Sequence, residues 1–479
     1  MLTKRDIARK LKELGLNNGD IVILHSSLSS CGKVQGGAEA VVAAFLEVLG
    51  KDGTLVVPVF GNFGVIPKAV ASLAGAVRSV HGCASIAAVG ASAEQICRDH
   101  WKAETAHGKD TPYTRIADMG GYVCLLGVDQ DRNTTLHSPE ALLELPYLSD
   151  KTCVFETPEE QIEKTWKYFP GPHRNFIGLD KTFRDSGKMK IGRIGNSVVR
   201  LIRSRYLLDI CLELGKRNPA FVLCGNPRCP DCKLQWGKIR EASFSRESFV
   251  IASSSALAGR YVPEMIENLS EAGINRLELD YIQRLPVDMI PENKLSKYVF
   301  ELREAKIAIS ALRSNGWGQS NLKLLDKAET LGIDRVVVPL HSQAEEFLRN
   351  AESRKITVSF SNNAISSQAA IEILQGLNSK GLQVGFTFNP ANFASIGEKP
   401  FLESYQRKPK IYVDQLDICD QTYDGCDTPL AKGNAEIKEL ISILRCSSFS
   451  GYMVLAMGNS RVSSLVEATD SLLGLINSM

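Results

Sequence analysis

The feature that most constrains the fold is a strand-then-helix pattern that recurs eight times between residues 246 and 479. Each unit has a short apolar run, suited to a strand buried on both faces, followed by an amphipathic stretch suited to a helix. Eight units in about 230 residues match a closed (β/α)8 barrel better than an open doubly wound sheet, which usually has fewer strands. The expected strands are 249–252, 276–279, 306–309, 335–338, 355–358, 383–386, 410–413 and 452–455.

The preceding residues are organised differently and predict a separate α/β domain. Thr3 and Asp6 form a capping-box pattern at the start of an amphipathic helix. Continuous apolar runs at 21–24, 54–59 and 123–128 suit buried strands, with a helix expected between the first two. A chain of 479 residues is long enough for two large cores. We therefore expect one domain over residues 1–245 and a barrel over residues 246–479.

Composition excludes several classes of partner. The chain has 56 Lys and Arg against 54 Asp and Glu, so its net charge of +2 provides no broad positive field for nucleic acid or an anionic membrane. No apolar run reaches the ~18–20 residues that cross a bilayer, and the N-terminal residues do not resemble a signal peptide. We expect a cytoplasmic protein without a nucleic-acid or membrane partner, whose 12 cysteines are mostly reduced thiols.

Six of the seven histidines lie within the first 173 residues, which concentrates histidine chemistry in the first domain. His137 follows the strand expected at 123–128, and Glu140 stands three residues later. A histidine can act as a general base near neutral pH, and a carboxylate on its other ring nitrogen fixes its tautomer. From the residues alone, an ordinary structural His–Glu pair on the surface is the alternative.

The loop after the first expected strand suits an anion. Ser26 and Ser27 follow that strand, and Gly36 and Gly37 open the next helix. Free backbone N–H groups and the helix dipole at such an N-terminus favour a phosphate. A turn with a helix cap and no ligand is the alternative interpretation.

Seven sequence blocks, in order, resemble the aminoglycoside 3-N-acetyltransferase family over roughly residues 1–240. The resemblance implies a three-layer α/β acetyltransferase domain with acetyl-CoA as cosubstrate. It implies that His137 is the catalytic base with Glu140 as its partner, and that the segment matching His25, Ser26, Ser27 and Leu28, together with Ser85, contacts coenzyme A. From the residues alone, His81 and His107 are secondary candidates for lining the acceptor pocket, and simple packing with hydrogen bonds to the backbone is the alternative for both. The blocks are 24–30, 36–37, 54–58, 78–81, 106–108, 125–127 and 133–140.

The acceptor is harder to define. No Asp or Glu occurs from Gly53 through Ala93, whereas a polycationic aminoglycoside needs carboxylates around it. Acidic residues between Asp150 and Glu163 are a possible compensation. We therefore expect N-acetylation of a primary amine on an aminoglycoside, an amino sugar or a related small molecule, with antibiotic resistance as one consequence and a homo-oligomer possible.

Three cysteines cluster near the domain boundary. Cys224, Cys229 and Cys232 have the spacing C-x4-C-x2-C, which can gather three thiolates around a zinc ion. A fourth ligand is needed, and Cys211 or Cys153 are the expected candidates. Three unligated thiols are the alternative.

Residues 247–475 resemble a degenerate sugar-phosphate isomerase/epimerase barrel of the xylose-isomerase-like type. The resemblance rests on blocks 386–393, 411–415, 428–434 and 451–455. That family binds a divalent metal through carboxylates and a histidine, but here Asn389 and Ala456 or Met457 stand where ligands are expected. We expect a non-catalytic barrel that binds a carbohydrate or a partner. The alternatives are different chemistry using Glu278, Asp280, Asp414 and Asp417, a catalytically silent scaffold, or an active isomerase with an inert front domain.

Overall fold

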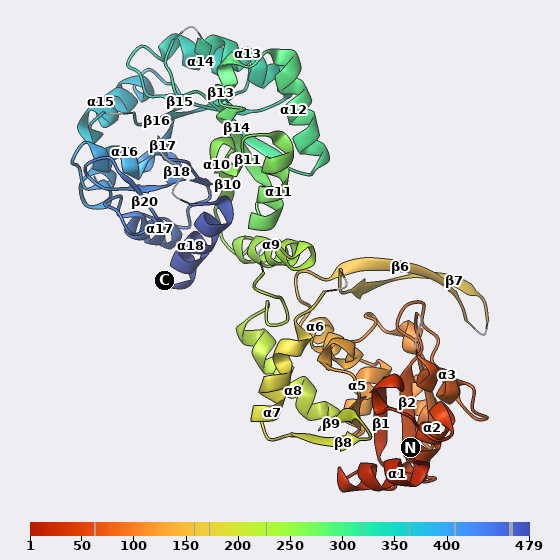
Figure 1. Ribbon diagram of the computed structural model, residues 1–479. Coiled ribbons are helices and arrows are strands. Elements are labelled where there is room, and N and C mark those ends of the chain that lie inside the picture. Colours follow the sequence, from red (N-terminus) through yellow and green to blue (C-terminus); the bar gives the residue numbers. More distant parts are fainter. Residues whose placement is uncertain are drawn as a thin grey trace. The chain divides into compact units, whose positions relative to one another are not determined.

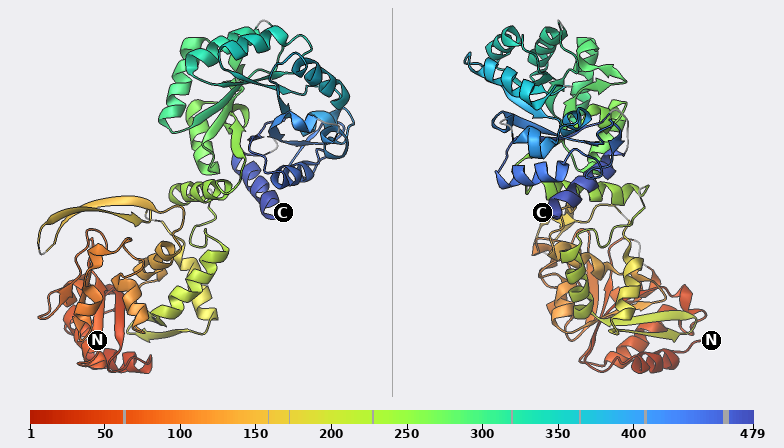
Figure 2. Two further views of the ribbon diagram at one scale, coloured as in Figure 1. Left: turned by 180° about the vertical axis from the view of Figure 1, so that it is seen from behind. Right: turned by 90° about the vertical axis from the view of Figure 1, so that its left-hand side faces the viewer.

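The computed structural model divides the chain into two compact units, Met1–Gln235 and Trp236–Met479 (Figures 1 and 2). The division falls inside helix α9 (Pro230–Phe244), whereas the boundary expected from sequence follows this helix. The structure describes residues 1–61, 64–157, 159–171, 173–226, 228–318, 320–363, 365–406, 409–458 and 463–479.

The first unit is built on a seven-stranded sheet of order β3-β4-β2-β1-β5-β9-β8. Strand β1 (Ile21–Ser26) lies between β2 (Thr54–Pro58) and β5 (Tyr122–Leu126) and is parallel to both. These are the three strands that the apolar runs predicted. The antiparallel strands outside them are β3 (Val77–Arg78), β4 (Ile86–Gly90), β8 (Met189–Ile194) and β9 (Ser197–Arg203).

Helices cover both faces of this sheet. On one face, Val22 and Leu24 of β1 share a core with Ile7 of helix α1 (Lys4–Glu13) and Phe45 of helix α2 (Gly37–Leu49). The capping box of Thr3 and Asp6 at the start of α1 is confirmed. The helices on this face are α1 (Lys4–Glu13), α2 (Gly37–Leu49) and α3 (Val65–Ala71), and those on the other are α4 (Ala93–Cys97), α5 (Pro112–Asp118) and α8 (Ser204–Arg217).

Further elements follow β5 and form the edge of the candidate site. They are α6 (His137–Leu142), the long antiparallel hairpin of β6 (Ser149–Glu156) and β7 (Gln161–Tyr168), the short 3-10 turn Phe176–Gly178 and α7 (Leu179–Asp185). The sequence did not predict the hairpin. Its strands carry mixed polar residues, and within these two strands only Trp166 is fully buried, while other alternate side chains are half-buried.

The second unit is a closed barrel of eight parallel strands with helices between successive strands (Figure 1). The strands are β10 (Val250–Ser254), β11 (Arg276–Leu279), β14 (Ala308–Arg313), β15 (Arg335–Pro339), β16 (Thr357–Ser361), β17 (Gly385–Phe388), β18 (Val413–Ile418) and β21 (Tyr452–Leu455). The helices are α10 (Ser255–Ala258), α11 (Val262–Ala272), α12 (Glu292–Glu304), α13 (Ser320–Leu331), α14 (Glu345–Ser353), α15 (Ser367–Asn378), α16 (Pro390–Ser395), α17 (Ile437–Cys446) and α18 (Leu465–Asn477). Two small hairpins, β12-β13 (Tyr281–Ile282, Leu285–Pro286) and β19-β20 (Asp420–Gln421, Asp427–Thr428), extend from strand ends.

All eight expected barrel strands are present, but several begin later than the sequence predicted. Lys306 and Lys355 have φ angles of 62° and 58°, so each adopts the left-handed conformation that ends the preceding helix. Strands β14 and β16 therefore begin two residues further along the chain. Lys410 lies in a 3-10 turn, which delays β18 in the same way.

The barrel interior carries a connected network of charged and amide groups. Arg313 donates to Glu278 at 2.9 Å and to Asp417 at 2.8 Å, and all three side chains are buried. Gln415 donates to Glu278 and Asp417, and its amide oxygen accepts from Arg335. Burial raises the pKa of Glu278, with Arg313 opposing that shift. The guanidinium of Arg313 thus supplies the positive charge that these two carboxylates require inside the barrel.

None of the helices in the described ranges is both long enough and apolar enough to span a membrane.

Replacing Arg313 by Met should destabilise the barrel by about 3–5 kcal/mol, because Glu278 and Asp417 would remain buried without their cation. Hydrogen exchange of barrel peptides at increasing urea concentration measures this loss in the full chain. Arg349→Met removes an exposed pair with Glu345 and should cost less than about 1 kcal/mol. Adding Glu278→Gln and Asp417→Asn to Arg313→Met should recover much of the loss. Equal effects of the two single Arg variants would contradict this account.

Candidate active site

His137 and Glu140 meet at the first turn of α6. The Nδ1 atom of His137 lies 2.6 Å from Oε2 of Glu140, as their three-residue spacing on a helix allows. The side chain of Glu140 is 1% exposed, whereas that of His137 is 13% exposed. Because a carboxylate accepts the Nδ1–H, the ring keeps Nε2 as its proton acceptor.

Two further donors hold the other carboxylate oxygen of Glu140. Arg174 donates from Nε to Oε1 at 2.7 Å, and the Tyr147 hydroxyl donates to the same atom at 2.9 Å. Burial raises the pKa of Glu140, but the hydrogen bond and charge of His137 and the charge of Arg174 outweigh it, so the net pKa is lowered. The carboxylate therefore stays ionised and orients the imidazole.

Aromatic rings enclose the imidazole of His137. Its ring stacks on Phe169 with centroids 3.4 Å apart and planes 2° apart, and Phe176 contacts it edge-on at 4.9 Å. Burial lowers the pKa of His137, and the hydrogen bond to Glu140 only partly opposes that shift. At neutral pH the ring is therefore a neutral base that can accept a proton from a nucleophile.

The two histidines expected on the acceptor side differ in position. The His107 ring lies 5.4 Å from that of His137, and its buried Nε2 atom has no hydrogen-bond partner among the described residues. His81 instead stacks on Trp166 with ring centroids 4.1 Å apart, and its ring packs at a tilted angle against His100 at 4.3 Å. Its Nδ1 atom accepts from two backbone N–H groups, at residues 83 and 84. His107 therefore borders the base, whereas His81 packs within a ring cluster.

Four of the five residues expected to contact a coenzyme line a cleft of about 930 Å³. His25, Ser26, Ser27 and Leu28 form one side, and Gly37, the first residue of α2, lies beside them. Arg132 also lines the cleft. The Ser26 hydroxyl is buried and has no hydrogen-bond partner among the described residues. A helix N-terminus, an unpaired hydroxyl and a guanidinium together form an environment suited to a phosphate.

Two of the residues expected to contact coenzyme A, Ser85 and His25, are buried. Ser85 is 3% exposed, its hydroxyl accepts from Arg78 at 3.3 Å, and it is not among the residues that line the cleft. Burial lowers the pKa of His25 to about 3, so this ring is neutral over the physiological range. His25 is thus unsuited to carry positive charge to a phosphate.

Two of the acidic residues that the sequence suggested could compensate, Asp150 and Glu163, are exposed on the β6-β7 hairpin. Asp150 pairs with Lys167 at 2.7 Å on the exposed part of the hairpin. Glu163 is exposed, whereas its neighbour Lys164 donates to two backbone carbonyls of the main body. The side chains that the hairpin packs against this body are apolar and aromatic, including Phe155 and Trp166. The compensation that the sequence suggested at Asp150–Glu163 is therefore not provided by these two residues.

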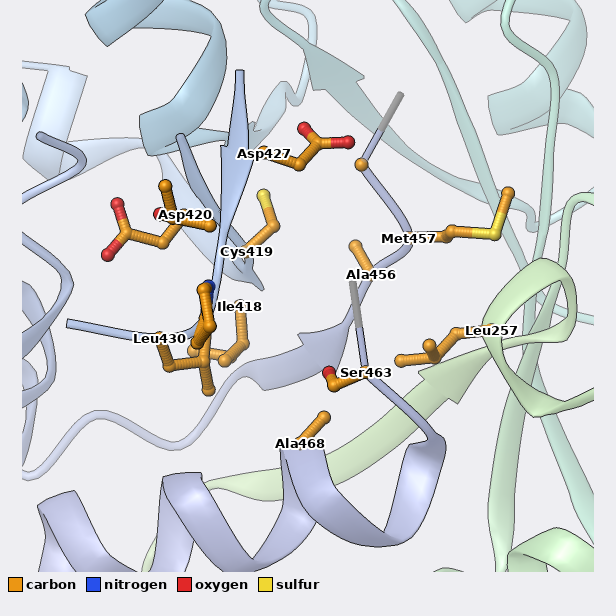
Figure 3. A pocket seen from close by; sticks show the side chains of 13 residues that line it. Leu257, Ile418, Cys419, Asp420, Asp427, Leu430, Ala456, Met457, Ser463 and Ala468 are labelled. Carbon is orange, nitrogen blue, oxygen red and sulfur yellow. The ribbon is translucent and has the colours of Figure 1, made fainter. Parts of the chain in front are cut away.

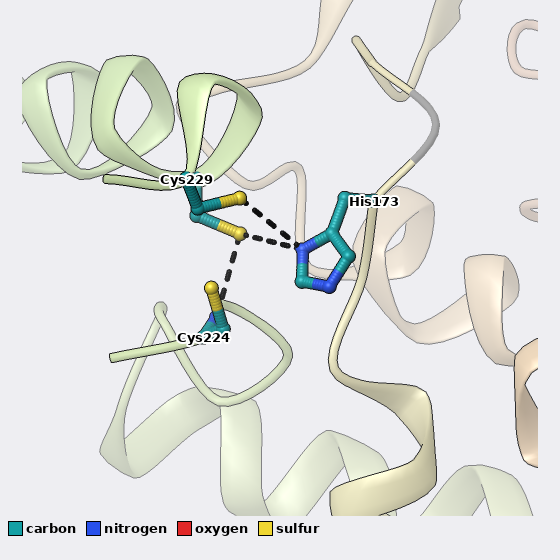
Figure 4. A group of neighbouring side chains, drawn as sticks. His173, Cys224 and Cys229 are labelled. Atoms are coloured by element: carbon teal, nitrogen blue, oxygen red, sulfur yellow. Dashed lines mark hydrogen bonds between the residues drawn. The ribbon is translucent and has the colours of Figure 1, made fainter. Parts of the chain in front are cut away.

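The cysteine cluster gathers around a histidine that the sequence did not indicate (Figure 4). Cys224, Cys229, Cys232 and His173 place one ligand atom each within 4.8 Å of one another. Neither Cys211, which is buried in α8, nor Cys153 in β6 belongs to this group. The expectation of a fourth cysteine is corrected, because the fold returns the segment before the Phe176 turn to the start of α9. Spacing could not reveal a ligand some 50 residues earlier.

The barrel has a polar pocket of about 520 Å³ at the carboxyl ends of its strands. Asp280, Arg313, Asn389 and Asp417 line it. Asn389 donates to Asp417, and Asp280 accepts from Ser255 and two backbone N–H groups. The adjacent pocket in Figure 3, lined largely by apolar groups such as Leu257 and Ile418, holds only about 40 Å³. Only the first of these has room for a small ligand.

Sequence reasoning missed three residues that shape the site of His137. Arg174 and Tyr147 hold Glu140, and Phe169 stacks on the base. The chain from Phe169 to Arg174 gave no periodic or motif signal, and its described residues form neither a helix nor a strand. An arginine beside His173 in a histidine-rich domain was the only hint available.

The first unit is similar in sequence to known proteins. A family model described as aminoglycoside 3-N-acetyltransferase matches residues 23–63 and 60–214. Aminoglycoside N(3)-acetyltransferase VII of Streptomyces paromomycinus is 36% identical over 261 residues, covering 43% of this chain and 89% of the relative. Aminoglycoside N(3)-acetyltransferase IX of Micromonospora chalcea is 32% identical over 208 residues, covering 35% and 72%. The apoenzyme structure of aminoglycoside acetyltransferase AAC(3)-IVa is 27% identical with a TM-score of 0.45, covering 48% of this chain and 95% of that one.

We expect the first unit to lose stability in mild acid before the barrel does. Burial lowers the pKa of His25 to about 3, of His81 to about 2 and of His100 to about 4, from 6.5 in the unfolded chain. The unfolded chain binds protons below pH 6.5 that the folded unit cannot. Their stabilising contribution is therefore complete above that pH and falls by about 1.4 kcal/mol per pH unit for each histidine below it.

Urea unfolding followed by peptide hydrogen exchange at pH 7.5, 6 and 5 tests this expectation. The second unit is an internal control, because His341 is its single histidine in the printed sequence. Parallel losses in both units would show that buried histidines do not cause the effect.

Proposed function

The chain belongs to the aminoglycoside 3-N-acetyltransferase family, and we propose that its first domain transfers acetyl from acetyl-CoA to a primary amine of an aminoglycoside or related amino sugar. The enzyme is an acyltransferase. The observation that carries the proposal is the 2.6 Å contact of His137 with the buried, ionised Glu140. This pair provides a neutral imidazole with one free nitrogen, which is the group that amine acylation requires.

In the proposed reaction, His137 acts at the amine. Its Nε2 atom accepts a proton as the amine nitrogen bonds to the thioester carbonyl carbon. Glu140 stabilises the imidazolium through Nδ1–H, and the ring returns the proton to the coenzyme A sulfur when the carbon–sulfur bond breaks. The products are the acetylated amine and the free thiol. Arg174 and Tyr147 keep Glu140 ionised and fixed throughout.

We assign coenzyme A to the cleft at the end of β1. Its phosphates would meet the N-terminus of α2 at Gly37, the hydroxyls of Ser26 and Ser27, and Arg132. His25 and Leu28 would shape the loop, and Ser85 would act through Arg78. A volume of about 930 Å³ is of the size that holds a bound cofactor.

The amine acceptor would lie on the His107 side of the base. The neighbouring rings Phe169 and Tyr168 offer the flat apolar surface on which a sugar ring can rest. His81 would support this side indirectly through Trp166. The ion pair of Asp150 favours an amino sugar of low charge over a highly cationic aminoglycoside, because a polycation needs several free carboxylates.

We propose that the second unit is a (β/α)8 barrel of the xylose-isomerase-like type that binds a ligand without catalysis. Arg313 occupies the two carboxylates, Glu278 and Asp417, that a divalent metal would otherwise require. Asp414 is likewise bonded to Arg335 and Ser359. The amides and carboxylates of the 520 Å³ pocket suit the hydroxyls of a small carbohydrate. We also propose a structural zinc ion at the cysteine cluster, which takes no part in acyl transfer.

His137→Ala should lower kcat for acetyl transfer by about 10²–10⁴-fold, because the amine loses its proton acceptor. Product is measured by mass spectrometry with acetyl-CoA and a panel of amino sugars and aminoglycosides. His341→Ala, a histidine stacked on Trp317 in the barrel, is the matched control and should keep full activity. A wild-type enzyme that binds coenzyme A but acetylates no amine would overturn the proposed function in favour of a silent scaffold.

The barrel should not interconvert aldoses and ketoses in the presence of Mg²⁺, Mn²⁺ or Zn²⁺, because its candidate metal ligands are bonded to arginine. Deuterium exchange from solvent into a panel of sugars and sugar phosphates, followed by NMR, measures the proton transfer of such a reaction. Metal-dependent exchange that Arg313→Met abolishes or alters would show that the barrel is an isomerase.

A further inference from the structure

The cysteine cluster lies next to the ion pair that holds the catalytic base. His173, whose ring contacts the thiols, precedes Arg174, whose Nε donates to Glu140. Four residues before His173, the ring of Phe169 stacks on His137. All of these residues belong to the first unit. The same short segment therefore connects the cluster to the catalytic pair.

The four side chains have the chemistry and spacing of a zinc site. The Nδ1 atom of His173 is 3.3 Å from Sγ of Cys232 and 3.4 Å from Sγ of Cys229 (Figure 4). With Zn–S bonds of about 2.3 Å and Zn–N bonds of about 2.0–2.1 Å, ligand atoms of a tetrahedral site stand roughly 3.4–3.8 Å apart. The observed group, including Cys224, fits within 4.8 Å. Three sulfurs and one imidazole nitrogen form a closed donor set, which is typical of a structural zinc ion.

Besides the ring contacts of Phe169 and the stacking of Arg174 over Tyr147 and Phe169, polar contacts hold this segment. The backbone N–H of His173 donates to Asp231, and Gln235 donates to the carbonyl of Pro170. Arg174 donates from Nη1 to the carbonyls of Pro170 and His173. The guanidinium thus takes its position from the backbone on which His173 lies. The described residues of this segment form no helix or strand that would hold it there.

We infer that a zinc ion bound by His173, Cys224, Cys229 and Cys232 positions the catalytic base by holding Arg174 against Glu140. This inference rests on the proposed acetyl transfer and extends it: the ion is outside the reaction, and His173 is a positioning residue. Zinc binding fixes the backbone at His173, Arg174 then stays on Oε1 of Glu140, and Oε2 stays on Nδ1 of His137. Loss of zinc frees this segment and loosens both Arg174 and the stacked Phe169.

The first measurement is the metal content of the full-length protein. Inductively coupled plasma mass spectrometry should find about one zinc per wild-type chain, as expected for one closed site, and the same for Cys153→Ser, a thiol outside the cluster. Cys229→Ser and His173→Ala should lose most of it. Replacement by Co²⁺ should give the intense visible bands of tetrahedral thiolate coordination. A metal-free wild type that also fails to take up Zn²⁺ or Co²⁺ would overturn the site.

The second measurement tests positioning through the pH profile of kcat. Glu140, Arg174 and His107 are the titratable and charged groups around His137, and the charge of Arg174 lowers its pKa. In His173→Ala, kcat should fall about tenfold or more while the KM for acetyl-CoA changes little, and the acidic limb should move to higher pH. Arg174→Met, which removes the positive charge beside Glu140, should shift the limb in the same direction with zinc still bound.

Chelation of zinc from the wild type, followed by its return, repeats the test if His173→Ala does not fold. Recovery of both kcat and the acidic limb supports the inference. Unchanged kcat and limb in zinc-free enzyme would show that the ion does not position the base. A zinc-loaded wild type without acetyl transfer would instead refute the proposed function, and the metal content would still report on the site.

Discussion

The buried carboxylate of Glu140 is the group on which the orientation of His137 depends. Removing an ionised carboxylate from water is costly unless charged or polar partners replace the lost hydration. Three partners from separate segments do so: His137 on α6, Tyr147 before the hairpin, and Arg174 after it. The hairpin must therefore return the chain to α6 before the charge is satisfied. The same requirement that stabilises this region also fixes the orientation of the imidazole.

The sequence could predict the parts of this site that are local. His137 and Glu140 are three residues apart on one helix, so their contact follows from helical geometry. Arg174 lies 34 residues beyond Glu140 in the sequence. The hairpin between them was not predicted, because its strands carry mixed polar residues. His173 joins the cysteines over an even longer separation. Contacts of this kind arise from tertiary packing, for which spacing in one sequence gives no information.

In the barrel, too, local sequence patterns predicted the strands but not the contacts between charged side chains on different strands. Its eight strands were predictable because short segments with apolar residues alternate regularly with amphipathic helical stretches, and errors occurred where a left-handed residue such as Lys306 ended the preceding helix. The sequence alone also shows an amide, Asn389, rather than a carboxylate near the end of one strand. The contacts of Arg313 with Glu278 and Asp417 were not predictable, because Arg313 approaches these carboxylates from a different strand. Only the closed barrel brings these charges together.

Both units bury carboxylates whose negative charge needs a partner, but the remaining contacts of these carboxylates differ. In each, arginine neutralises a buried carboxylate. In the first unit Arg174 and Tyr147 take one oxygen of Glu140, which leaves the other for a histidine whose second nitrogen can still accept a proton. In the barrel, Arg313 and neighbouring amides take both oxygens of Asp417. A carboxylate so fully bonded stabilises the barrel and has no oxygen left for a metal ion, whereas Glu140 holds an imidazole that can still accept a proton.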